Sequence, residues 1–162
     1  MFVSKRRAIA TFVALAALVA GNVALVGATP VASVHDGDLV PYAIVDGAIP
    51  KSLTTEAGDP ARGLAVVLDR KLGNCQSCHN MPIPSSPDHG NIGPDLTGIG
   101  KSLSGPQLRL RLVNMKVLDP QTIMPAYYRV SGLEGVSKEF ADKPILTARQ
   151  IEDLVAYLKT LK

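Results

Sequence analysis

The sequence predicts an all-α domain of three to five helices, with irregular loops between them and an N-terminal extension in front. Two observations support this fold class. Capping boxes stand before two stretches with helical apolar spacing, and the intervening segments are rich in Pro and Gly. We expect three parts in the 162-residue chain: a signal peptide at 1–28, an extension at 29–57 and the helical domain at 58–162.

The first 28 residues have the features of an export signal. Residues 5–7 are basic, residues 8–20 form an apolar run, and residues 26–28 offer small side chains at a cleavage site. An uncleaved anchor is the alternative, because residues 8–28 are just long enough to span a bilayer. Gly and Asn at 21–22 weaken the apolar run, which favours cleavage.

Removal of this leader makes the chain formally neutral. The leader holds three of the 17 Lys and Arg residues and none of the 14 Asp and Glu residues, so 14 basic residues remain beside 14 acidic ones. A neutral chain gives no reason to expect a nucleic-acid-binding protein.

Residues 29–57 contain three prolines and no sustained period. We expect an irregular segment with a short strand at 39–45, which either lies across the domain or reaches a partner. The first helix is expected to follow, with Asp59 as N-cap, Pro60 at the first helical position and a body at 61–72.

Residues 80–103 hold four prolines and several glycines, which predicts a long loop. A loop of this length is uncommon in a compact domain and becomes reasonable if it packs on a large cofactor. The next helix is expected from Ser104, which forms a capping box with Gln107. Residues 108–112 also alternate as a strand would, but the capping box favours a helix that ends before residue 119.

The last helix is the clearest element of the sequence. Thr147 and Gln150 form its capping box, and apolar residues follow at helical spacing over 151–161. Glu152 and Asp153 lie off the apolar stripe.

The two cysteines lie in one pentapeptide, Cys75–Gln76–Ser77–Cys78–His79, which has the C-x-x-C-H spacing of a covalent haem attachment site. Residues three and four apart lie on one side of a helical turn, so both thiols can reach one porphyrin edge and His79 can lie over the iron. A disulfide or redox pair is the alternative, and zinc would require about four ligands. We expect one haem c, bound through Cys75 and Cys78, with His79 as an iron ligand.

Five side chains are candidates for the sixth iron ligand: Met81, Met115, Met124, His35 and His89. Met81 is too close to His79 in sequence to cross easily to the other face of the ring, and Met115 has a core-like helix position. Met124 lies in an irregular stretch and can reach the iron without breaking a helix, so we expect it to be the ligand. A thioether ligand raises the reduction potential and closes the sixth position, which indicates electron transfer.

The stretch Gly93–Pro94–Asp95–Leu96 supplies a candidate partner for His79. A ligating His usually donates its second ring N–H to a carbonyl or carboxylate oxygen, and the Pro94 carbonyl could accept it. An ordinary turn is the alternative.

Together these features resemble class I cytochromes c, which share a helix running into C-x-x-C-H, a later Gly-Pro-x-Leu, an axial Met followed by Pro, and a closing amphipathic helix. The resemblance implies the class I cytochrome c fold around one haem for residues 58–162. It also implies that the first and last helices cross, with Gly63 and Tyr157 at the contact.

Residues 58–63, 123–128 and 152–158 resemble SoxX more narrowly, the small monohaem subunit of the SoxAX cytochrome. That resemblance implies an electron acceptor for thiosulfate oxidation, in which SoxA joins thiosulfate to a cysteine of the carrier SoxY. Electrons would then pass to a downstream cytochrome. The chain would be a non-catalytic subunit of an L-cysteine S-thiosulfotransferase complex, and the extension at 29–57 is the first guess for the SoxA contact. The implied cofactor residues are Cys75, Cys78, His79, Pro94 and Met124.

Two other functions remain open. A free-standing shuttle to a terminal oxidase would use the same ligands but would not need the extension. A sensor or peroxidase would need an open sixth position. Because haem is attached after translocation, we expect unfolded export to the periplasm through Sec, although Arg6 and Arg7 allow the twin-arginine route.

Overall fold

The computed structural model describes residues 39–162, and within this range it contains four α-helices, three short 3₁₀ helices and no strand. The signal peptide expected at 1–28, the first part of the extension and His35 lie outside the described residues. The predicted all-α fold is confirmed. None of the described helices has the length and apolar character needed to cross a bilayer. The α-helices are α1 (Pro60–Leu68), α2 (Ile99–Ser102), α3 (Gly105–Asn114) and α4 (Ala148–Thr160), and the 3₁₀ helices are η1 (Cys75–Ser77), η2 (Met115–Val117) and η3 (Lys138–Phe140).

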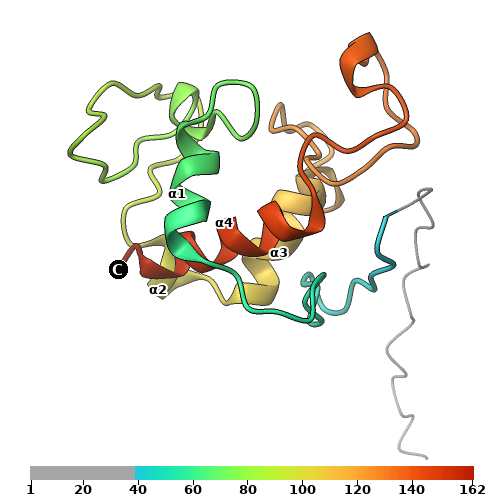
Figure 1. Cartoon of the computed structure of the whole chain (residues 1–162), viewed down its shortest axis with the longest axis horizontal. Coiled ribbons are helices and arrows are strands. Elements are labelled where there is room, and N and C mark those ends of the chain that lie inside the picture. The colour runs from blue at the N-terminus through green and yellow to red at the C-terminus, as the bar shows by residue number, and fades with distance from the viewer. Residues whose placement is uncertain (1–38) are drawn as a thin grey trace, which may run out of the picture.

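Helix α4 contacts each of the other three α-helices, most extensively α1. In Figure 1, α1 and α4 cross, and α3 lies beside α4. The capping box predicted at the start of α4 is present: the Gln150 N–H donates to Thr147 Oγ1 at 3.2 Å, and the Thr147 N–H donates to Gln150 Oε1 at 2.9 Å. The cap therefore fixes where the apolar stripe of α4 begins.

Gly63 allows α1 and α4 to approach closely. A Cβ at Gly63 would overlap the carbonyl oxygen of Asp153 and lie 2.7 Å from the Cβ of Tyr157. The predicted contact between Gly63 and Tyr157 is thus confirmed, and its physical cause is the absence of a side chain at the crossing.

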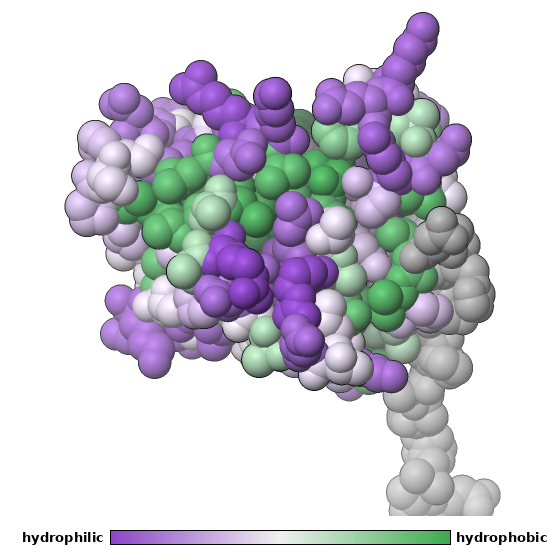
Figure 2. All heavy atoms as spheres, viewed as in Figure 1, coloured by the Kyte–Doolittle hydropathy of each residue, from purple (hydrophilic) through white to green (hydrophobic). Residues whose placement is uncertain are grey.

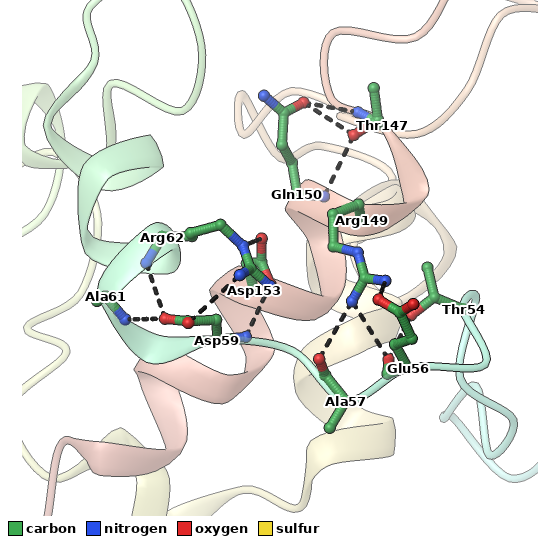
Figure 3. Close-up of polar contacts among 10 residues, drawn as sticks. All are labelled: Thr54, Glu56, Ala57, Asp59, Ala61, Arg62, Thr147, Arg149, Gln150 and Asp153. Carbon is green, nitrogen blue, oxygen red and sulfur yellow. Dashed lines mark hydrogen bonds and ion pairs between the residues drawn. The ribbon is translucent and has the colours of Figure 1, made fainter.

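The N-terminus of α1 is bound to α4 through charged side chains, as Figure 3 shows. Asp59 is the predicted N-cap and accepts from the Ala61 N–H at 2.7 Å. Its own N–H donates to Asp153 Oδ1 at 2.7 Å, and Arg62 Nε donates to Asp153 Oδ2 at 2.8 Å. Asp153 is only 1% exposed although it lies off the apolar stripe, because these donors satisfy its carboxylate.

Helix α1 ends at Leu68, four residues before the expected end. The chain then turns back, and the Gly73 N–H donates to the Val66 carbonyl at 3.2 Å. A Cβ at Gly73 would lie 2.7 Å from that carbonyl oxygen, and Asn74 has a left-handed φ of 47°. Tertiary contact overrides the helical periodicity here and turns residue 75 toward the interior.

Residues 39–57, the N-terminal strap, pack on the domain. Tyr42, Ile44, Ile49 and Leu53 are buried in the common core. The strand expected at 39–45 is wrong, because among the described residues the strap has only an isolated bridge between Val45 and Ala48. The alternating burial of the strap comes from packing on helices, not from a partner strand.

A buried ion pair joins the strap to α3 and α4. Arg109 and Glu152 are 7% and 5% exposed, and the guanidinium donates to both carboxylate oxygens at 2.6 and 2.8 Å. Arg109 also donates to the Ile49 carbonyl at 2.7 Å, and the Leu53 N–H donates to Glu152 at 2.9 Å. The strap is therefore part of the folded domain.

Candidate functional site

A cavity of about 540 Å³ opens between α1, α3, α4 and the long loops. Its wall is largely apolar, and Figure 2 shows apolar side chains gathered on one face of the molecule with polar groups around them. On α3 the cavity-lining residues Leu108, Arg111 and Leu112 recur at helical spacing, and Met115 follows at the start of η2, so one face of this helix forms a wall. This volume lies in the range of sites for cofactors and other small molecules.

The C-x-x-C-H pentapeptide forms one edge of the cavity. Residues 75–77 make a 3₁₀ turn, and the His79 N–H donates to the Cys75 carbonyl at 3.0 Å. Cys75, Cys78 and His79 all line the cavity, and both thiols are free. Burial raises the pKa of the Cys75 thiol to about 11, whereas a redox or nucleophilic cysteine needs a lowered pKa. Cys75 therefore lacks the lowered pKa that a catalytic thiol requires.

His79 has a shaped seat between the turn and the proline-rich loop. Its Nδ1–H donates to the Pro94 carbonyl at 2.7 Å, which leaves the lone pair of Nε2 available to a metal. A Cβ at Gly93 would overlap the imidazole and lie 2.6 Å from Nδ1. Gly93 thus provides the space in which the ring lies.

The proline-rich loop returns along the pentapeptide through backbone hydrogen bonds. The Gly90 N–H donates to the Gln76 carbonyl at 2.7 Å, and the Gly93 N–H donates to the Cys78 carbonyl at 2.8 Å. These bonds place Ile92, Gly93, Pro94 and Leu96 on the cavity wall. The loop is long because it forms one side of the cavity.

The structure separates the candidates for the sixth ligand into two groups. Met81, Met115 and Met124 line the cavity, whereas His89 is exposed and hydrogen-bonds the adjacent Gly90 carbonyl. Met81 is 3% exposed and packed in the core, and Met115 begins η2. Met124 is half-buried in a loop, so its side chain could turn toward a metal without disturbing a helix.

Sequence patterns did not single out Tyr127 and Arg111 as cavity residues. Tyr127 is buried, and its hydroxyl donates to the Gly73 carbonyl at 2.9 Å. Burial raises the pKa of Tyr127, so the phenol keeps its proton at ordinary pH. Arg111 lies on the cavity-facing side of α3, three residues after Leu108. This helical spacing is the sequence feature that could have predicted its position.

A haem c fits these residues. Two thiols, an imidazole with a free Nε2 and thioether side chains line one apolar cavity. The imidazole occupies space that a Cβ at position 93 would fill. The charged groups among the described lining residues are all cationic and would complement the two propionates of a haem. They are Arg70, Lys71 and Arg111.

The fold and this cavity define an electron-transfer haem protein, and the chain belongs to the cytochrome c family, whose members bind haem c covalently: residues 61–162 match the family Cytochrome c. Within that family it is a cytochrome of the SoxX type. It matches a chain of the crystal structure of SoxXA from P. pantotrophus with 38% identity and a TM-score of 0.69, over 75% of this chain and 94% of that chain. No curated protein sequence matches the chain.

Proposed function

We propose that the chain binds one haem c through Cys75 and Cys78, that His79 and Met124 would hold its iron, and that the chain works as the periplasmic electron-transfer subunit of a SoxAX-type complex. The observation that supports this most is that the pentapeptide and the Met124 loop, far apart in sequence, line the same apolar cavity.

Each residue has a defined part in this proposal. The haem supplies a one-electron Fe(III)/Fe(II) couple. His79 presents Nε2 because the Pro94 carbonyl accepts from Nδ1 at 2.7 Å and fixes the ring tautomer. Met124 contributes a soft thioether, which favours Fe(II) and raises the potential. The apolar wall keeps water from the site and favours the less charged, reduced state.

The partner proposal rests on the SoxXA crystal structure, which holds a complex. We infer that a larger SoxA-like subunit joins thiosulfate to the cysteine of a SoxY-type carrier, and that this chain takes the released electrons to a downstream cytochrome. From the sequence, the extension at 29–57 is the segment expected to contact SoxA. Its described part packs on the chain's own core, so partner binding is not needed to account for it.

The haem assignment is tested by expressing the full chain with c-type maturation machinery. One haem per chain should resist acid acetone extraction, and Cys75→Ala with Cys78→Ala should abolish this retention. Met124→Ala should remove the weak band near ~695 nm and lower the potential. Met81→Leu and Met115→Leu are matched controls and should keep the band. If Met115→Leu removes the band and Met124→Ala does not, the axial assignment is wrong.

The partner proposal is tested in the native host. The mature chain should begin near residue 29 and co-purify with a larger haem protein, and its Soret and α bands should shift to the reduced form when thiosulfate and the carrier are added. A monomeric chain that thiosulfate does not reduce, and that donates to a terminal oxidase, would instead identify a free-standing shuttle.

A further inference from the structure

Tyr127 connects two walls of the cavity that are 54 residues apart in sequence. Its hydroxyl donates to the Gly73 carbonyl at 2.9 Å, two residues before Cys75. Its own backbone is held on both sides, because its N–H donates to the Leu112 carbonyl at 3.2 Å and its carbonyl accepts from the Leu146 N–H at 2.9 Å. The backbone of Tyr127 is therefore fixed by Leu112 and Leu146, and its side chain extends to the cysteine-bearing turn.

The position of the Met124 loop depends on these backbone hydrogen bonds of Tyr127. The Met124 N–H donates only locally, to Thr122 Oγ1 at 3.2 Å, and Pro125 has no N–H. Within the described part of the chain, Tyr127 is the first residue after Met124 whose backbone bonds to a distant segment. Before Met124, Lys116 Nζ donates to the Thr122 carbonyl at 2.8 Å. The place of Met124 thus follows from anchors at Thr122 and Tyr127.

The turn on the other side is closed locally, because the Leu72 and Asn74 N–H groups donate to the Asp69 carbonyl at 3.2 and 3.0 Å. Helix α1 ends at Leu68, and Gly73 is held by one long backbone bond, 3.2 Å, to Val66. The Tyr127 hydroxyl is the donor to the Gly73 carbonyl, and this bond is buried. Loss of that donor would leave a buried carbonyl unsatisfied, so the bond resists separation of the two walls.

We propose that Tyr127 is a positioning residue: its hydroxyl bond to Gly73 sets the distance between the cysteine-bearing turn and the Met124 loop, and so keeps the thioether on the iron. This inference rests on the proposed axial role of Met124. The raised pKa of Tyr127, caused mainly by burial, keeps the donor in place as the pH rises.

The adjacent tyrosine supplies a matched control. Tyr128 is also buried, its N–H donates to the Val113 carbonyl at 3.3 Å, and its hydroxyl accepts from the Val40 N–H at 2.9 Å. Tyr128→Phe therefore removes one part-buried hydroxyl bond to the strap, whereas Tyr127→Phe removes one buried hydroxyl bond at the cavity. Both variants keep the aromatic ring and remove only the hydroxyl group.

The experiment compares these two variants of the haem-loaded full chain with the wild type. The temperature at which the ~695 nm band disappears is measured beside the global unfolding midpoint from far-UV circular dichroism. Tyr127→Phe should widen the gap between the two temperatures, and Tyr128→Phe should lower both together. An unchanged gap in Tyr127→Phe, or an equal widening in both variants, overturns the proposal.

Hydrogen exchange gives a second readout that does not require Met124 to bind iron. Tyr127→Phe should speed exchange about fivefold in peptides covering 72–79 and 119–126, as loss of one ordinary hydrogen bond predicts. Tyr128→Phe should leave these peptides unchanged. Uniform acceleration across the chain overturns the proposal. A wild-type protein without the band would contradict Met124 ligation, while exchange would still decide the role of Tyr127 as a link between the two walls.

Discussion

Because Gly93 has no Cβ, the imidazole of His79 can lie against its backbone. The ring lies where a Cβ would stand and donates to the carbonyl of the next residue, Pro94. The sequence identified the pentapeptide and Pro94 from their spacing and chemistry. The need for Gly at 93 could not be predicted, because it arises from the approach of two segments that are 14 residues apart.

Gly93→Ala should displace the His79 ring and destabilise the folded chain by about 1–3 kcal/mol, as overpacking does. Urea unfolding measures the stability, and the ferric spectrum reports the state of the axial histidine. Pro94→Ala keeps the carbonyl and should have the smaller effect on both. A larger effect of Pro94→Ala would show that the ring of Pro94, not the space at Gly93, holds His79.

At the scale of elements, the crossing of α1 and α4 orders the domain. Both helix starts were predictable, because Asp59, Thr147 and Gln150 act through local hydrogen bonds. The end of α1 was not predictable from periodicity, since the bonds of Gly73 and the left-handed Asn74 depend on the fold. Helix α2 was missed for a related reason: Gly100 lies against the C-terminal carbonyls of α4, and a Cβ there would lie 2.6 Å from the Leu158 carbonyl oxygen.

Gly63→Ala should push α1 away from α4, because the new Cβ would overlap a backbone carbonyl that cannot rotate away. We expect a loss of about 3 kcal/mol in the free energy of unfolding, at the upper end for overpacking. Gly105→Ala is the matched control. Gly105 is the first residue of α3, and its Cβ would meet Val155 Cγ1 at the ordinary distance of 3.6 Å, so stability should change by no more than about 0.5 kcal/mol. Equal losses in both variants would contradict the close-approach account.

At the scale of the molecule, the Arg109–Glu152 pair joins the strap, α3 and α4. Sequence spacing placed Glu152 off the apolar stripe and therefore gave no sign of its burial. The chain can bury both charges because each has several partners, including Ile49 and Leu53 of the strap. The strap thus completes the core beside α3 and α4.

Glu152→Gln should destabilise the chain by about 3–5 kcal/mol, because it leaves the Arg109 charge buried without its carboxylate. Glu56→Gln is the matched control, since Glu56 pairs with Arg149 but its side chain is 80% exposed. That variant should change stability by about 0–1 kcal/mol. Urea unfolding at neutral pH measures both, and similar losses would argue against a structural role for the buried pair.

The folded chain should lose stability in acid through this pair. Burial by itself would raise the pKa of Glu152, but the hydrogen bonds from Arg109 and Leu53 outweigh it and lower the pKa. A lowered folded pKa means that the stabilisation is complete above the unfolded pKa of about 4.3 and is lost as the pH falls through the folded pKa. Unfolding free energies between pH 6 and 2 should therefore fall steeply in the wild type. The same slope in Glu152→Gln would show that other carboxylates cause the loss.

The sequence by itself determined the features that depend on neighbours along the chain: the capped helix starts, the C-x-x-C-H turn, the irregular loops and the all-α class. Tertiary structure alone decided where α1 stops, that the strap belongs to the core, that Glu152 and Asp153 are buried, and that Tyr127 reaches Gly73. The reason is physical. Local hydrogen bonds and periodicity are set within a few residues, whereas burial of a charge or a close backbone approach depends on which distant segment supplies the partner.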